Sequence, residues 1–183
     1  INLGILNYID GVSIHPYSFL NKDKNIRSPE ENFNKIVMLE NIIKKVSNSK
    51  SDIPIYITEM GVSNFRGNGG ASQESSADFI VKYTAMISTL PFVKGIWWYD
   101  LINDGTDSGE KEHNFGFYNH DKTKKKVVEP FIRLMKEIKS GNLRSCSVEY
   151  VKDSVVIEGP DTNKQLECMS WKINKFEQYN RII

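Results

Sequence analysis

Asp52-Ile-Pro-Ile-Tyr-Ile-Thr-Glu-Met-Gly-Val-Ser-Asn64 is a short apolar run that ends in a carboxylate. Residues 53–57 are mostly β-branched or aromatic, which is typical of a buried strand in a parallel sheet. Because side chains alternate along a strand, Glu59 is predicted to share a face with Ile55 and Ile57, the face that would fill the interior of a closed sheet. A glutamate there is costly to bury unless it is paired or used in chemistry. Glu59 is therefore either held by loop amides or catalytic, and the neighbouring segments favour a catalytic role.

Two further segments look like short strands that end in polar or aromatic residues. They are Asp10-Gly-Val-Ser-Ile-His-Pro-Tyr17 and Val93-Lys-Gly-Ile-Trp-Trp-Tyr-Asp-Leu101. Helical periodicity predicts three helices at residues 28–47, 72–90 and 127–138, the first of them with a serine N-cap. This alternation of strand and helix predicts an α/β fold with a parallel sheet, whose strand ends converge on one rim.

The last part of the chain changes character. It contains three short strand-like segments, at Ser145–Tyr150, Ser154–Glu158 and Gln165–Ile173. Short strands separated by turn residues favour an all-β arrangement. We therefore predict one unit at residues 1–141 and a β-rich C-terminal appendage at residues 142–183, either whole or cut short.

Composition and charge narrow the classes of function. The chain has 183 residues with a formal net charge of +1 and no clustered basic stripe, which argues against a nucleic-acid partner. The lysine run 124–126 is predicted to be a solvated loop. No apolar run approaches the ~20 residues needed to span a bilayer. No motif for a metal or a phosphate is present, so we expect no cofactor and no metal. Cys146 and Cys168 fit a disulfide or two buried thiols equally well.

Three motifs together carry a family resemblance: His15-Pro-Tyr17, Ile57-Thr-Glu-Met-Gly61 and Gly95-Ile-Trp-Trp-Tyr-Asp100. In this order and spacing they resemble the last three strands of a clan A glycoside hydrolase, a TIM-barrel clan that includes families 5 and 39. The segments at 112–117 and 121–125 look closer to family 39. The resemblance covers roughly residues 8 to 140. It implies the C-terminal portion, about strands six to eight, of a (β/α)8 TIM barrel, which the β-rich appendage predicted above would follow.

The resemblance implies roles for three polar residues. Glu59 matches the clan's nucleophile, while His15 and Tyr17 match positions that hydrogen-bond the nucleophile or the sugar. A retaining glycosidase needs an ionised carboxylate about 5–5.5 Å from a second carboxyl group. Hydrogen bonds from a tyrosine hydroxyl or an imidazole favour the ionised form. The alternative for His15 is a strand-end histidine that is bonded to a carbonyl.

The same resemblance implies an aromatic contact with the substrate. Trp98 matches the residue on which the sugar ring stacks, and Trp97 is the alternative if the register differs by one. Trp98 shares a face with Ile96 and Asp100, so we predict that all three point into the barrel. The alternative is that both tryptophans pack between the sheet and the helices. Asp100 and Glu112 either contact substrate or satisfy loop amides.

The expected function is that of a retaining glycoside hydrolase that acts on a poly- or oligosaccharide. The clan's acid/base glutamate follows an asparagine at the end of strand four, and nothing before Asp10 supplies it. We therefore expect the missing N-terminal part of the barrel to be a partner, this chain alone to be inactive, and the complete protein to be extracellular or in the cell envelope. The alternatives are a non-catalytic carbohydrate-binding remnant and an unrelated α/β domain in which Glu59 is structural.

Overall fold

The structure is a computed structural model that describes residues 4–18, 27–47, 53–140, 147–151 and 154–158. The chain divides into two compact units, Ile1–Leu134 and Met135–Ile183. Within the described residues, no helix is both long and apolar enough to cross a membrane.

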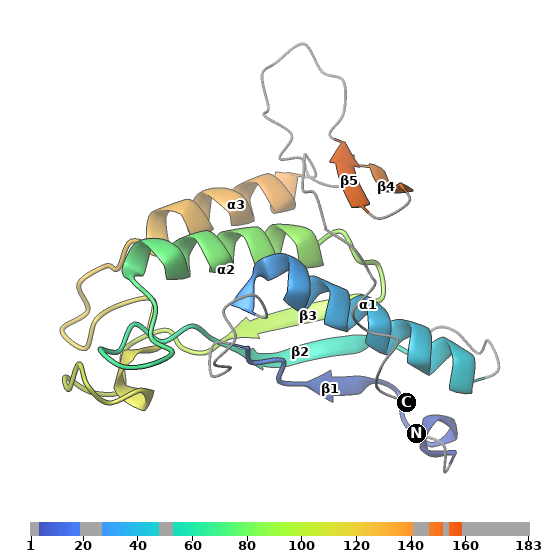
Figure 1. The fold of residues 1–183 in the computed structure, drawn as a ribbon, viewed down its shortest axis with the longest axis horizontal. Helices are drawn as coiled ribbons and strands as arrows, with labels where there is room; N and C mark the ends of the chain where they lie inside the picture. Colours follow the sequence, from blue (N-terminus) through green and yellow to red (C-terminus); the bar gives the residue numbers. More distant parts are fainter. Residues whose placement is uncertain (1–3, 19–26, 48–52, 141–146, 152–153, 159–183) are drawn as a thin grey trace. The chain divides into compact units, whose positions relative to one another are not determined.

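The first unit is built on a parallel sheet of three strands (Figure 1). The strands are β1 (Val12–Ile14), β2 (Ile55–Met60) and β3 (Val93–Trp98), and they are neighbours in that order. Helix α1 (Pro29–Val46) connects β1 to β2, and helix α2 (Gln73–Ile87) connects β2 to β3. The predicted strand–helix alternation and parallel pairing are therefore confirmed.

Local sequence signals explain where the helices begin. Helix α1 starts after Ser28, whose Oγ accepts a hydrogen bond of 3.1 Å from the Glu31 backbone N–H, and proline occupies its first position. Helix α2 starts in the same way after Ser72, whose Oγ accepts from the Ser75 N–H. The predicted starts of both helices are confirmed. Helix α3 (Val128–Ser140) begins and ends within two residues of its predicted bounds.

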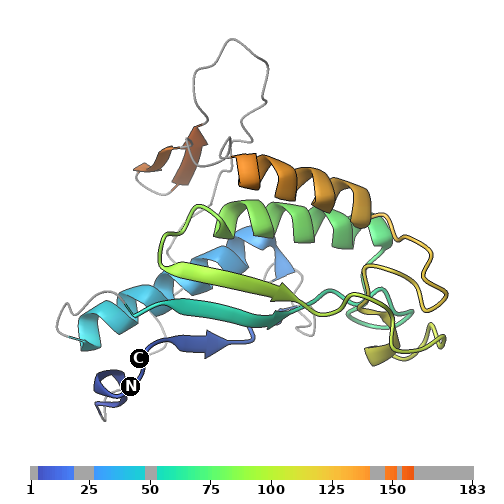
Figure 2. The ribbon, with the colours of Figure 1, turned by 180° about the vertical axis from the view of Figure 1, so that it is seen from behind.

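The helices cover one face of the sheet and leave the other face open. The views from both sides agree that α1 and α2 lie on the same side of the strands (Figures 1 and 2). The core between them consists of fully buried side chains: Phe33, Ile36, Ile43, Ile55, Ile57, Met60, Tyr83 and Met86. We refer to the two sides as the helix-covered face and the open face.

Ile55 and Ile57 share one face of β2, as predicted, but the prediction that this face fills the interior of a closed sheet is wrong. Ile57 pairs with Ile96 of β3. Trp98 lies two residues further along β3, so it points to the same side as Ile96, and it hydrogen-bonds Thr84 of α2. Neighbouring residues in register point to the same side of a sheet, so Ile57 lies on the helix-covered face together with Ile55. Both are completely buried there. The face that was expected to fill a barrel interior is instead the one that packs on the helices.

An irregularity in β2 separates Glu59 from these isoleucines. Ile57 pairs with Ile96 and Met60 pairs with Trp98, so β2 uses one residue more than β3 over the same distance. Such a bulge interrupts strict alternation and re-aims a side chain. Met60 is consequently buried on the helix-covered face. The carboxylate of Glu59 reaches Tyr17, beyond the end of β1, so its predicted place beside Ile55 and Ile57 is also wrong.

The second unit contains an antiparallel pair of strands, β4 (Ser147–Val151) and β5 (Ser154–Glu158), with Val148 opposite Ile157. The two strands predicted in this region are present within two residues of their expected bounds. The third, Gln165–Ile173, lies outside the described residues, as do Cys146 and Cys168. The division at residue 141 stays a prediction.

Candidate active site

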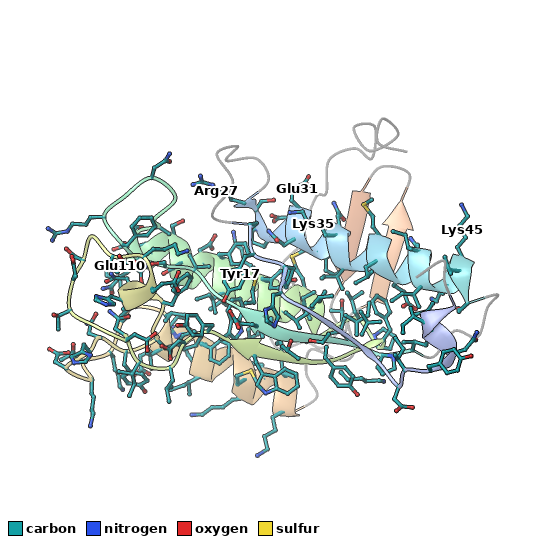
Figure 3. All side chains as sticks on the ribbon, turned by 90° about the horizontal axis from the view of Figure 1, so that it is seen from below. Tyr17, Arg27, Glu31, Lys35, Lys45 and Glu110 are labelled. Carbon is teal, nitrogen blue, oxygen red and sulfur yellow. The ribbon has the colours of Figure 1, made fainter. Side chains whose placement is uncertain are left out.

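Glu59 lies at the carboxyl end of β2 with two of the residues that the sequence predicted beside it. The hydroxyl of Tyr17 donates a hydrogen bond of 2.6 Å to Oε1 of Glu59. Nδ1 of His15 lies 3.7 Å from Oε2. The Glu59 side chain remains 40% exposed, so an incoming molecule can reach it. Figure 3 labels Tyr17 in a view onto this side of the sheet.

The environment of Tyr17 keeps its hydroxyl protonated. Burial raises the pKa of Tyr17 well above its ordinary value, and the hydrogen bond to Glu59 and the charge of that carboxylate raise it further. A protonated phenol can donate to a carboxylate, and a hydrogen bond to a charged acceptor is stronger than one to a neutral acceptor. Tyr17 is thus a fixed donor to one Glu59 oxygen.

A polar network on the open face orients His15. Its Nε2 lies 3.0 Å from Oγ1 of Thr58, which in turn lies 2.6 Å from Oγ of Ser13. The imidazole therefore spans Thr58 on one side and Glu59 on the other. The structure gives the ring these two side-chain partners in place of the carbonyl that the alternative required.

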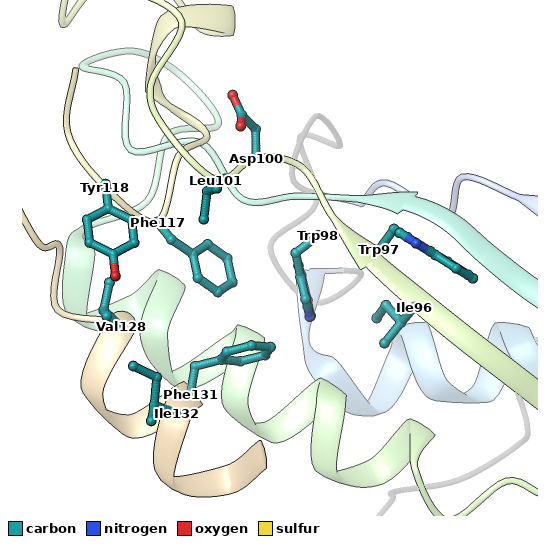
Figure 4. Close-up of a pocket in the computed structure, with 10 residues that line it drawn as sticks. All are labelled: Ile96, Trp97, Trp98, Asp100, Leu101, Phe117, Tyr118, Val128, Phe131 and Ile132. Atoms are coloured by element: carbon teal, nitrogen blue, oxygen red, sulfur yellow. The ribbon is translucent and has the colours of Figure 1, made fainter. Parts of the chain in front are cut away.

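The two tryptophans point to different sides of β3. Nε1 of Trp98 donates to Oγ1 of Thr84 at 3.1 Å, and the Trp98 ring contacts Tyr83 of α2 at 6.1 Å. Trp97 is 53% exposed and lies 6.5 Å from the ring of Tyr56. Figure 4 shows Trp98 pointing toward the helices, in a direction different from that of Trp97. The predicted inward orientation of Trp98 is therefore wrong, because Trp98 packs on the helix-covered face.

An apolar cavity of about 370 Å³ adjoins Trp98 (Figure 4). Its lining comes mainly from the end of β3 and the start of α3, and includes Leu101, Phe117, Phe131 and Ile132. Glu59, Tyr17 and His15 do not line it. The cavity and the polar residues around Glu59 are therefore separate sites.

Asp100 has a partner in its own loop. Its Oδ1 accepts a hydrogen bond of 3.1 Å from the Ile102 backbone N–H, and its own N–H donates to the Phe115 carbonyl. The first contact corresponds to the loop-amide alternative, and contact of Asp100 with substrate stays a prediction. Glu112 forms an ion pair of 2.7 Å with Lys111 on the same rim.

Two aromatic residues beside the site were missed by sequence reasoning. The Tyr99 backbone N–H donates to the Met60 carbonyl at 2.7 Å, which places Tyr99 next to the end of β2. The ring of Phe115 lies between Tyr99, at 5.2 Å, and Tyr17, at 6.1 Å. Because side chains alternate along a strand, the sequence could have placed Tyr99 on the same side of β3 as Trp97. No local signal identifies Phe115, because its position depends on the packing of loops.

The hydroxyl of Tyr99 is also held in place. It donates to Oδ2 of Asp104 at 2.7 Å, and this bond, followed by burial, raises the pKa of Tyr99 to about 12. Within the part of the chain that the structure describes, no three His, Cys, Asp or Glu side chains are placed to hold a metal ion. The arrangement is thus a carboxylate with phenol and imidazole partners, next to the half-buried ring of Tyr99 and the buried ring of Phe115.

Comparisons with known proteins relate the chain to glycoside hydrolases. A family model described as glycosyl hydrolase catalytic core matches residues 8–128, more than half of the chain. No curated protein matches. A family 39 glycoside hydrolase from Bacteroides cellulosilyticus WH2 is similar in structure, with a TM-score of 0.62 and 19% identity, over 86% of this chain and 33% of that one.

Two further solved structures have a similar fold. A GH5_18 protein from Bifidobacterium longum subsp. infantis has a TM-score of 0.54 and 19% identity, over 70% of this chain and 30% of that one. A β-glucuronidase from Bifidobacterium dentium has a TM-score of 0.51 and 17% identity, over 70% of this chain and 21% of that one. The chain thus spans about a third or less of the length of these relatives. With its α/β fold of parallel strands and covering helices, the chain belongs to the glycosyl hydrolase catalytic core family and is related to the TIM-barrel glycoside hydrolases.

Proposed function

We propose that the complete protein is a retaining glycoside hydrolase that acts on a poly- or oligosaccharide, with Glu59 as its nucleophile. The observation that carries the proposal is the 2.6 Å hydrogen bond from Tyr17 to a Glu59 carboxylate that is still 40% exposed. A nucleophilic carboxylate must be ionised, oriented and accessible. The Tyr17 hydroxyl supplies orientation and a donor to one oxygen, and leaves the other oxygen for attack.

In the reaction, Glu59 attacks the anomeric carbon and forms a covalent glycosyl–enzyme intermediate, which water then hydrolyses. A second carboxyl group about 5–5.5 Å away protonates the leaving oxygen and later activates the water. We assign this acid/base to a part of the barrel that precedes β1. In this proposal β1, β2 and β3 are strands six to eight of a (β/α)8 barrel, and the missing strands pair with the outer edges of β1 and β3 so that the open face lines the barrel interior.

Substrate contacts are proposed for the groups that surround Glu59. In this proposal His15 and Tyr17 hydrogen-bond the carboxylate or a sugar hydroxyl; support comes from the 2.6 Å bond of Tyr17 and the 3.7 Å distance from His15 Nδ1 to Oε2 of Glu59. Because Trp98 packs on the helices, we assign the aromatic contact with the sugar to its neighbours Trp97 and Tyr99. A flat ring matches the apolar face of a pyranose and offers a large contact area.

The test uses the complete protein with Glu59→Gln, and Glu110→Gln on the same rim as the matched control. Gln keeps the size of the side chain but cannot act as a nucleophile, so turnover should fall by on the order of 10³-fold or more while the melting temperature stays unchanged. Glu110 is exposed and should tolerate the change. Azide should restore turnover to Glu59→Gly and give a product of inverted configuration.

Two outcomes would contradict the proposal. Near-normal turnover in Glu59→Gln would remove Glu59 from the chemistry, and oligosaccharide binding without any turnover in the complete protein would favour the non-catalytic alternative. Robust hydrolysis by residues 1–183 alone would contradict the assignment of the acid/base to a part outside this chain.

A further inference from the structure

Lys125 is a buried lysine at the centre of the loops behind the candidate site. Only 4% of its surface is exposed, although the lysine run 124–126 was predicted to be solvated. That prediction is wrong for this residue. Taking an ammonium group out of water is costly unless its donors are satisfied. A buried lysine outside the predicted machinery therefore calls for a physical explanation.

The ammonium group of Lys125 has three acceptors for its three donors. Nζ donates to Oδ1 of Asn103 at 2.7 Å, to the Asn114 carbonyl at 3.0 Å and to Oδ1 of Asn64 at 3.1 Å. Burial lowers the pKa of Lys125 to about 8, and the charge of Asp100 opposes that shift, so the group is mostly protonated at pH 7. No shorter or neutral side chain could supply three such donors.

These acceptors come from separate loops at the carboxyl ends of the strands. Asn64 follows β2, whereas Asn103 and Asn114 belong to the long connection that follows β3. The same carbonyl of Asn114 also accepts from the Asn64 backbone N–H at 3.0 Å, and Oδ1 of Asn103 also accepts from Gly116 at 2.9 Å. One buried cation thus fixes the backbone on both sides of Phe115.

Phe115 connects this cluster to the candidate nucleophile. Its ring is 94% buried and packs edge-on to Tyr17, with ring centroids 6.1 Å apart and an interplanar angle of 74°. It also fits closely against Gly61, where an added Cβ would lie only 2.8 Å from the Phe115 ring. Phe115 therefore limits how far the Tyr17 ring can move, and the Tyr17 hydroxyl is the group that donates to Glu59.

We propose that Lys125 is a positioning residue for the Glu59 site, which acts by fixing the 112–117 segment so that Phe115 holds the Tyr17 hydroxyl on Glu59. The effect of Lys125 passes through Phe115 and Tyr17 and requires no contact with substrate. The consequence for catalysis rests on the proposed function, whereas the consequence for Tyr17 does not.

The test compares Lys125→Met with Lys126→Met in the complete protein. Lys126 is exposed and pairs with Glu74, so it is a matched control for loss of one lysine in the same loop. Lys125→Met should lower kcat about 10-fold or more, with KM changed less than about twofold, while Lys126→Met changes neither. In a Tyr17→Phe background the same substitution should lower kcat less than about twofold, because its effect passes through Tyr17.

A second readout does not depend on activity. In protein labelled with ¹³C at the tyrosine ring, the Tyr17 signal, assigned by its loss in Tyr17→Phe, should shift and titrate at lower pH in Lys125→Met but not in Lys126→Met. Phe115→Leu should give the same change without removing a buried charge, and it serves if Lys125→Met fails to fold. Equal kcat losses with and without Tyr17, or a Tyr17 signal unmoved in both variants, would overturn the proposal. If the protein shows no hydrolysis, the Tyr17 signal still decides between these outcomes.

Discussion

On the helix-covered face of the sheet, Ile55, Ile57 and Met60 are fully buried, whereas on the open face Thr58 and Trp97 remain exposed. The first set comes from β2, and the second combines Thr58 of β2 with Trp97 of β3. The first set supplies apolar area to the core, which is the main favourable term in folding. The open face carries the polar network that reaches Glu59. The comparison predicts that substitutions on one face change stability and those on the other change binding or chemistry.

The largest expected effect on stability is at Ile57. Ile57→Ala should lower the free energy of unfolding by about 4 kcal/mol, because it leaves a cavity in a fully buried position. Thr58→Ala, one residue further and on the open face, should cost only about 1 kcal/mol while it lowers turnover, since His15 loses a partner. Urea denaturation and steady-state kinetics of the complete protein measure both. Equal losses of stability would remove the distinction between the faces.

A smaller contrast concerns the aromatic residues at the end of β3. Trp98→Ala should lower the free energy of unfolding by about 3 kcal/mol, because the indole loses its contacts with α2. Tyr99→Ala should cost less stability but weaken oligosaccharide binding by about 1 kcal/mol or more. Denaturation would measure the loss of stability in each variant, and calorimetric titration with oligosaccharides would measure the loss of binding. If Trp98→Ala weakened binding and left stability intact, the original inward prediction for Trp98 would be restored.

The smallest contrast is between two tyrosines, the half-buried Tyr17 and the fully buried Tyr83. Burial alone raises the pKa of Tyr83, which lies on the helix-covered face. The pKa of Tyr17 is raised by burial and, in addition, by its hydrogen bond to Glu59 and the charge of that carboxylate. Glu59→Gln should therefore lower the pKa of Tyr17 and leave that of Tyr83 unchanged in a spectroscopic titration. Above pH 10 the unfolded chain releases tyrosine protons that the folded chain keeps, so stability falls as pH rises. This fall should be less steep in Glu59→Gln; an identical fall would argue against coupling of Tyr17 to Glu59.

The helices and the strand order could be predicted because their signals are local. Ser28 and Glu31 form a recognisable helix start, and the alternation of strands with helices of this length allows few arrangements other than parallel pairing. Which face the helices cover could not be predicted. β2 is apolar on both sides, with Ile57 on one and Tyr56 on the other, so alternation defines two faces without saying which is buried.

The site was predictable where its residues end strands and not where they lie in loops. Tyr17 and Glu59 were expected to converge because parallel strands end at one rim, and they do. The bulge that aims Glu59 depends on pairing with β3, which the sequence of β2 does not encode. Phe115 and Lys125 act through contacts between loops, and a lysine within a lysine run carries no sign of burial.

The most direct test of the central claim is to trap the covalent intermediate. A fluorosugar glycoside with a good leaving group slows hydrolysis of the glycosyl–enzyme, so the sugar stays on the nucleophile. After digestion of the inactivated complete protein, mass spectrometry should find the sugar on the peptide that contains Glu59, with fragmentation assigning it to that carboxylate. A label on another carboxylate, or hydrolysis of the natural substrate with inversion and no label, would contradict the account.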